Sequence, residues 1–182
     1  VTGLYFQTRD VDLTRDFYDW NLGQQAVFTS IYDTQNIAWF GQIETVINDK
    51  TTVISGLRLE HNRGDYADSY PISESTSDTM LGGKLAVEYQ VVPRTMIYTS
   101  LTRGYKAGGV NAEALAKAKD AGLSGDNTFF INNTTFEPEY LWNAEFGVKG
   151  SSIDDKLRLR ITTFYMHRDN MQLEAWKVEG QE

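Results

Sequence analysis

The sequence of 182 residues contains no cysteine. It therefore offers neither a disulfide framework nor a thiolate metal site. Its formal net charge of −8 argues against duplex DNA as a partner, because neutralising phosphates requires clustered lysine and arginine. No apolar run reaches about 18 residues, so no transmembrane helix is encoded, and no signal peptide is expected at Val1. Composition alone indicates a soluble β-rich domain.

Alternation of apolar and polar residues is the main pattern in the chain. Successive side chains of a strand point to opposite faces of a sheet. In 140–149 the even positions are apolar or aromatic, and in 157–165 so are the odd positions except Thr163. This parity places one set of charges on a single face: Glu44, Arg58, Glu60, Glu88, Glu145, Lys149, Arg158 and Arg160. Glu145 and Lys149 are expected to point inward with Arg158 and Arg160 of the neighbouring strand, and these charges are expected to pair with one another across the lumen wall.

Two architectures produce this alternation. In a soluble β-sandwich the apolar face is the core and the charged face meets water. In an outer-membrane barrel the apolar face meets lipid and the charged face lines a polar lumen. Alternation by itself leaves both possibilities open.

Strand lengths and connections favour the barrel. Several strands reach ten residues or more, whereas the usual mode is about five or six and a tilted membrane-crossing strand needs about 9–11. The connections alternate between tight turns and long loops, as in outer-membrane barrels. About seven strands are predicted, at 2–9, 35–48, 51–64, 79–91, 94–105, 138–150 and 155–170, with long loops at 10–34, 65–78 and 106–137.

Several linked segments also resemble the barrel of TonB-dependent outer-membrane receptors. They are "YTSLTRGYKAGGVN", "FEPEYLWNAEFGVKG" and "DKLRLRITTFYMHRDNMQ", in that order. The resemblance implies an all-β antiparallel meander that forms part of a transmembrane barrel, which has 22 strands in the family and a plugged lumen. About seven strands are too few to close such a cylinder. Residues 1–182 are therefore expected to be a partial barrel without the plug domain and the remaining strands.

The resemblance further implies a function for the parent protein. It would be an outer-membrane receptor of a Gram-negative bacterium that takes up a scarce nutrient actively. Its partners would be outer-membrane lipid, an inner-membrane TonB complex reached through the absent plug domain, and a small ligand. A ferric siderophore is the expected cargo, with haem, cobalamin or a glycan as further options. The alternatives are a soluble sandwich that serves in binding or adhesion and a passive porin-like channel.

One candidate binding site lies where a strand ends. Arg103, Tyr105 and Lys106 stand at the outer rim of the strand, before two glycines that let the chain bend into a loop. Cationic donors suit carboxylate or catecholate oxygens, and tyrosine can stack on rings. The alternative is that these residues anchor the strand at the interface. Within the loop, residues 112–121 are predicted to form a short helix between Asn111 and Gly122.

Other chemistry has little support in the sequence. His61 and His167 are the only histidines, and we expect each to form hydrogen bonds at a strand end in preference to ligating haem. The acidic residues of 65–78 do not follow the spacing of a calcium loop, so a solvated loop is expected there. No catalytic motif is found. We therefore predict no metal site, no cofactor and no enzymatic activity.

Overall fold

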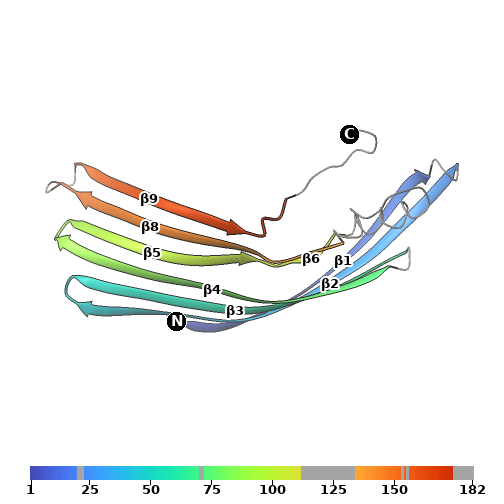
Figure 1. Ribbon diagram of the computed structural model, residues 1–182, viewed down its shortest axis with the longest axis horizontal. Coiled ribbons are helices and arrows are strands. Elements are labelled where there is room, and N and C mark those ends of the chain that lie inside the picture. The colour runs from blue at the N-terminus through green and yellow to red at the C-terminus, as the bar shows by residue number, and fades with distance from the viewer. Residues whose placement is uncertain (20–22, 70–71, 112–133, 153, 155, 174–182) are drawn as a thin grey trace.

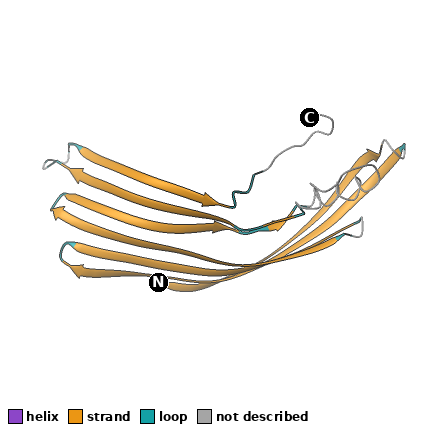
Figure 2. Ribbon diagram, in the orientation of Figure 1, coloured by secondary structure: helices purple, strands orange, loops and turns teal. Residues whose placement is uncertain are grey.

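The computed structural model describes residues 1–19, 23–69, 72–111, 134–152, 154 and 156–173. This part of the chain is all β (Figures 1 and 2). Its strands are β1 (Thr2–Asp19), β2 (Gln24–Asn48), β3 (Thr51–Asp68), β4 (Ser73–Val92), β5 (Thr95–Lys106), β6 (Gly109–Val110), β7 (Thr135–Phe136), β8 (Glu139–Ser151) and β9 (Arg158–Asp169). Among the described residues, no helix is long and apolar enough to span a membrane.

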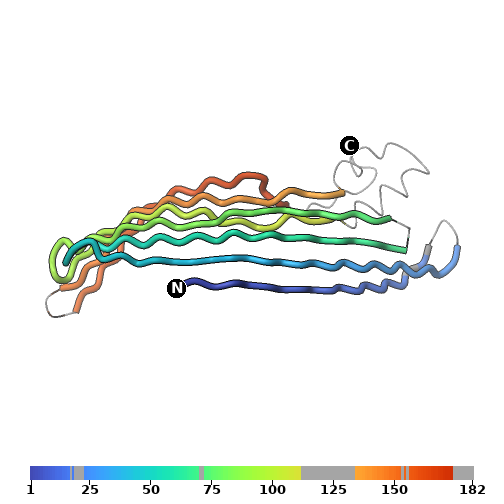
Figure 3. Tube along the Cα trace, turned by 90° about the horizontal axis from the view of Figure 1, so that it is seen from below, coloured from blue at the N-terminus to red at the C-terminus, as the bar shows by residue number. Residues whose placement is uncertain are grey.

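Seven of the strands form one curved antiparallel sheet. Its order is β1-β2-β3-β4-β5-β8-β9, so each long strand pairs with the next one along the chain. The remaining two strands, β6 and β7, pair with each other in a separate two-stranded sheet between β5 and β8 in sequence. The sheet is a single layer (Figure 3). These features confirm the prediction of an antiparallel meander of about seven long strands.

Three short turns lie together at one end of the sheet, on the left of Figure 1. In the first, the Asn48 side-chain oxygen accepts a hydrogen bond from the Lys50 amide at 2.9 Å, as an Asx turn does. The second passes through Pro93, where the backbone N–H is not required by the ladder. In the third, Ser152 donates to Asp154 at 2.7 Å. We refer to this end as the short-turn end.

The opposite end corrects the prediction of two long loops. Residues 10–34 and 65–78 lie mostly on strands, because β1 and β2 pair continuously to Asp19↔Gln24, and β3 and β4 pair to Ala67↔Ser73. Only residues 20–23 and 69–72 connect these strands, with Gly23 at a φ of 64°. The 106–137 connection is long as predicted, while the predicted helix at 112–121 lies outside the described residues.

The register divides the side chains of the sheet between two faces. One face, here called the apolar face, carries large exposed hydrophobic residues from every long strand. Examples are Leu85 of β4, which is 53% exposed, and Ile161 of β9, which is 59% exposed. No described element packs over this face. The opposite face, here called the polar face, carries all eight charges that parity had grouped together.

On β3 and β4 the apolar residues of the apolar face occupy a limited band. On β3 they end at Leu59, and on β4 they end at its partner Leu81. Since β2 has 25 residues and a membrane crossing needs about 9–11, the strands continue well beyond this band. We refer to the band as the apolar belt.

Beyond the belt the distribution of apolar residues reverses on β1. Asp10 and Asp12 of β1 lie on the side of the apolar face, while Val11 points to the polar face opposite Tyr32. Tyr66 is the next residue in this row and is buried, as is Met80 of β4, which is 0% exposed. The small core of the described chain therefore lies on the polar face, because the outer side of the strands meets water there.

Candidate functional site

The candidate site begins where β5 separates from β4. Their ladder ends at the pair Gly83↔Arg103, although β5 continues to Lys106 beside β8. After this point the Tyr105 ring passes over Gly82 on the polar face. A Cβ atom on Gly82 would lie 2.8 Å from the Tyr105 ring and 3.1 Å from the Arg103 carbonyl oxygen. Glycine at position 82 is therefore required for this close approach.

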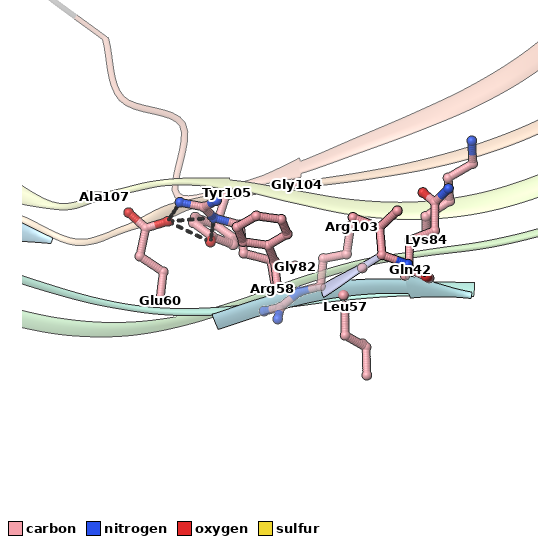
Figure 4. Close-up of a pocket in the computed structure, with 15 residues that line it drawn as sticks. Gln42, Leu57, Arg58, Glu60, Gly82, Lys84, Arg103, Gly104, Tyr105 and Ala107 are labelled. Atoms are coloured by element: carbon pink, nitrogen blue, oxygen red, sulfur yellow. Dashed lines mark hydrogen bonds and ion pairs between the residues drawn. The ribbon is translucent and has the colours of Figure 1, made fainter. Parts of the chain in front are cut away.

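Tyr105 forms hydrogen bonds with two charged residues of β3 (Figure 4). Its hydroxyl donates to Glu60 Oε2 at 2.9 Å and accepts from Arg58 Nε at 3.0 Å. Arg58 also contacts Glu60 directly, with Nη2 and Oε2 2.7 Å apart. The Glu60 side chain is only 13% exposed. These three residues, which we call the Arg58 cluster, join the end of β5 to β3 across β4.

Aromatic residues extend this cluster toward the N-terminus. The Arg58 guanidinium carbon lies 5.2 Å from the centroid of the Tyr5 ring and 5.9 Å from that of Phe40. Both distances are within the range of a cation–π interaction. A Cβ atom on Gly3 would collide with the Phe40 ring. Arg58 therefore connects residues of β1, β2, β3 and β5 on the polar face.

An open depression of about 780 Å³ surrounds the Arg58 cluster. Gly56 and Gly104 leave the backbone accessible along its floor. Its lining is Val1, Phe40, Gly41, Gln42, Gly56, Leu57, Arg58, Glu60, Gly82, Gly83, Lys84, Arg103, Gly104, Tyr105 and Ala107. Arg58 is neutralised by Glu60, whereas Lys84 forms no ion pair within the described chain. The depression therefore offers an ammonium group, a phenol and an amide to a ligand.

The base of the 106–137 loop packs on the same face. Gly108 lies close to the Phe136 carbonyl, and a Cβ atom there would be 2.8 Å from an Asp78 carboxylate oxygen. From the other side, the Gln172 side chain donates to the Ala107 carbonyl at 2.9 Å and to the Glu137 carbonyl at 3.1 Å. The strands β6 and β7 are therefore held against the sheet.

Arg103 lies on the opposite face from Arg58. Its guanidinium carbon is 4.0 Å from the Tyr140 ring centroid and 5.5 Å from that of Trp142. Its Nη1 donates to the Leu81 carbonyl at 2.7 Å, at the position where β4 loses its β5 partner. Of the three predicted ligand-binding residues, only Arg103 and Tyr105 border the depression, and Lys106 does not.

The predicted ion pairs between β8 and β9 are absent. Glu145 accepts a hydrogen bond from Asn143 at 2.8 Å and lies opposite Phe164. Lys149 lies opposite Arg160, a residue of the same charge. The error arose because parity fixes the face of a side chain but not its register along the strand.

The histidines and acidic residues lie beyond the belt. His61 forms a hydrogen bond with Thr79 at 3.0 Å, and His167 with Asp169 at 2.9 Å. Both histidines lie on the side of the apolar face. On the polar face, burial and the charge of Asp68 raise the pKa of Tyr66 to about 12. Among the described residues, no group of three histidine or acidic side chains is placed to hold a metal ion.

Sequence reasoning missed the residues that complete the site. Tyr5, Phe40 and Gln42 follow ordinary strand patterns, and nothing in the sequence links them to Arg58 or Tyr105. Gly82 gave the one available signal, since paired glycines inside a strand pattern indicate close approach by another group.

Together these features define a class of protein: a curved antiparallel sheet with an apolar outer belt and a polar inner face, as in a transmembrane β-barrel. The chain belongs to the TonB-dependent receptor family, since residues 1–180 match the model for the family's β-barrel ("TonB dependent receptor-like, beta-barrel"). It is therefore part of a protein of the outer membrane of Gram-negative bacteria. This result removes the soluble sandwich from consideration.

Solved structures share this fold. The ferric yersiniabactin uptake receptor FyuA from Yersinia pestis is 20% identical, with a TM-score of 0.71 over 94% of this chain. The copper transporter OprC is 16% identical, with a TM-score of 0.63 over 90% of this chain. The alcaligin outer-membrane receptor FauA from Bordetella pertussis is 12% identical, with a TM-score of 0.53 over 93%. The matches cover 26%, 26% and 30% of those three proteins, respectively.

Proposed function

We propose that this chain forms part of the barrel of a longer receptor that takes up a scarce nutrient across the outer membrane. The observation that carries the proposal is the family match over residues 1–180, together with a sheet that has one apolar face and one polar face. The inward-facing polar side would line the lumen and face a plug domain encoded elsewhere in the receptor. Energy would come from an inner-membrane TonB complex acting through that plug.

A ferric siderophore is the proposed cargo. One structural neighbour is named as a ferric yersiniabactin uptake receptor and another as an alcaligin outer-membrane receptor. The depression beside Tyr105 supports this choice, because Lys84 could contact anionic oxygens and the Tyr105 ring could stack on a ring of the ligand. Arg58 would not bind the ligand directly, because its charge is paired with Glu60; it would instead hold Tyr105 in place.

Copper is the second candidate cargo, since OprC is named as a copper transporter. Haem has less support from this segment. His61 and His167 lie on the side of the apolar face and are already hydrogen-bonded, so neither is directed into the lumen as an axial ligand. We also infer that the receptor is not an enzyme, because the family is one of receptors.

Uptake by the intact receptor tests this proposal. The gene that encodes the full protein would be deleted, and cells grown without iron would be given ⁵⁵Fe-loaded siderophores of the catecholate, hydroxamate and carboxylate classes. We expect the deletion strain to lose uptake of one siderophore class. The plasmid-borne gene should restore that uptake only in cells that have TonB. Uptake that persists without TonB would indicate a passive channel. Loss of copper accumulation with normal iron uptake would establish copper as the cargo.

A further inference from the structure

A second depression lies at the short-turn end of the polar face, between the β4–β5 turn and the start of β9. Its volume is about 610 Å³. Its lining is Gln90, Pro93, Arg94, Met96, Lys149, Gly150, Ser151, Arg158, Leu159 and Arg160. Four of these described residues are cations and none is a carboxylate, in a chain whose formal net charge is −8. We call this region the basic depression.

The cations of β8 and β9 lie side by side. Lys149 is the direct cross-strand partner of Arg160, and Arg158 is opposite Ser151 at the next position of the same face. Directly opposed like charges destabilise a sheet, whereas opposite charges stabilise it. Within the described part of the chain, none of these three cations forms an ion pair. Their arrangement therefore calls for a counter-anion from outside the described chain.

The side chain of Lys149 is positioned by an aromatic ring. Its Nζ atom lies 4.6 Å from the centroid of the Tyr98 ring. That ring packs against Gly147, where any Cβ atom would collide with it, and its hydroxyl forms a 2.9 Å hydrogen bond with Thr162. Three strands, β5, β8 and β9, thus hold the ring beneath the ammonium group. Arg94 fixes the adjacent turn by donating to the Ser152 carbonyl at 2.8 Å.

We propose that the basic depression binds a carboxylate between Lys149, Arg158 and Arg160. Guanidinium groups can grip a carboxylate with two parallel N–H donors, and an ammonium group adds a compact charge. Two sources share this chemistry: an acidic side chain from another part of the same receptor, and the carboxylates of a small molecule in the lumen. The inference needs only that the polar face be the barrel interior and does not depend on which cargo is carried.

Carbodiimide coupling in the full receptor tests the site and separates the two sources. The reagent joins an amine to a carboxylate in contact with it, so Lys149 reports what occupies the depression. A cross-linked peptide between Lys149 and an acidic residue of the receptor would establish the protein source. A citrate adduct on Lys149, formed only when citrate is added, would establish the small-molecule source. The Lys156–Asp154 pair, 3.0 Å apart, serves as the internal positive control.

A double variant supplies the matched comparison. Arg158→Gln with Arg160→Gln is expected to lower the yield of the Lys149 product at least tenfold. Arg9→Gln with Arg15→Gln removes the same charge from the polar face of β1 and should leave the yield unchanged. Resistance to SDS at room temperature identifies the folded barrel in each preparation. The proposal is overturned if Lys149 stays unmodified while the control pair reacts, or if both double variants give the wild-type yield.

Discussion

The strand β3 carries two arginine–acid pairs of the same spacing, and they differ in almost every other respect. Arg58 and Glu60 lie on the polar face, with side chains that are 37% and 13% exposed. Arg63 and Asp65 lie on the opposite face beyond the belt, with side chains that are 60% and 46% exposed. The closest N–O distances are similar, 2.7 Å and 2.9 Å.

The difference shows that surroundings, and not the pair itself, decide what such a contact contributes. Glu60 is covered by Tyr105, which also hydrogen-bonds with Arg58, so solvent screens this pair poorly. Asp65 accepts hydrogen bonds from Arg63 and Ser75 in open solvent, where salt and water weaken an ion pair. The first pair is therefore expected to stabilise the sheet and the second to contribute little.

The largest effect is expected for Glu60→Gln. Gln keeps the shape of the side chain but leaves Arg58 without its counter-charge on a surface that is partly closed to water. We expect the free energy of unfolding to fall by about 2 kcal/mol. The measurement is urea-induced unfolding of the full receptor in detergent micelles. Glu44→Gln on the same face is the control, and an equal loss in both variants would contradict the assigned role of the Arg58 cluster.

A smaller effect is expected for Tyr105→Phe. The ring still packs over Gly82, but two hydrogen bonds of the hydroxyl are lost while Arg58 and Glu60 remain paired. The expected loss is about 1 kcal/mol. Limited proteolysis should also cleave the 106–137 connection faster, because the end of β5 is held to β3 through this hydroxyl. Unchanged proteolysis and stability would show that ring packing alone holds the strand.

The smallest effect is expected for Asp65→Asn, with a change within about 0.5 kcal/mol at neutral pH. Its signature is in the pH dependence. Hydrogen bonds from Arg63 and Ser75 lower the folded-state pKa of Asp65, so the unfolded chain binds this proton more tightly. The stabilisation is thus present above the unfolded value of about 3.9 and is lost as the pH falls through the folded pKa.

Unfolding midpoints of wild type and Asp65→Asn should therefore converge as the pH is lowered below about 4. The same comparison at high salt should bring the two proteins together even at neutral pH. A difference that persists in acid would mean that Asp65 acts through packing and not through its charge.

The sequence predicted the architecture well within the belt and poorly beyond it. Leu59, Leu81 and Trp142 alternate with polar neighbours because one side of their strands meets lipid. Beyond the belt the outer side of the strands no longer meets lipid. There, Val11 lies on the polar face and Asp10 lies on the opposite side. The side of a strand on which apolar residues alternate depends on whether that side meets lipid or water. The prediction assumed one pattern throughout, so it assigned the extended ends of β1 to β4 to loops.

The candidate site was predictable only in part. Arg58, Glu60 and Tyr105 were each singled out, the first two by parity and the third by its position before a pair of glycines. Their association depends on β5 separating from β4 after Arg103, and no local pattern encodes that event. The opposition of Lys149 and Arg160 was missed for a related reason, since it depends on the register between two strands.

The central claim is that this sheet is barrel wall with lipid on one face and the lumen on the other. Lipid quenching tests it most directly, because the chain has no cysteine and single cysteines can report on neighbouring positions. Bimane would be attached at positions 84 and 85, and at 145 and 146, in the full receptor reconstituted with brominated lipids. We predict strong quenching for Leu85→Cys and Phe146→Cys and weak quenching for Lys84→Cys and Glu145→Cys. Equal quenching within each pair, or the reverse parity, would contradict the account.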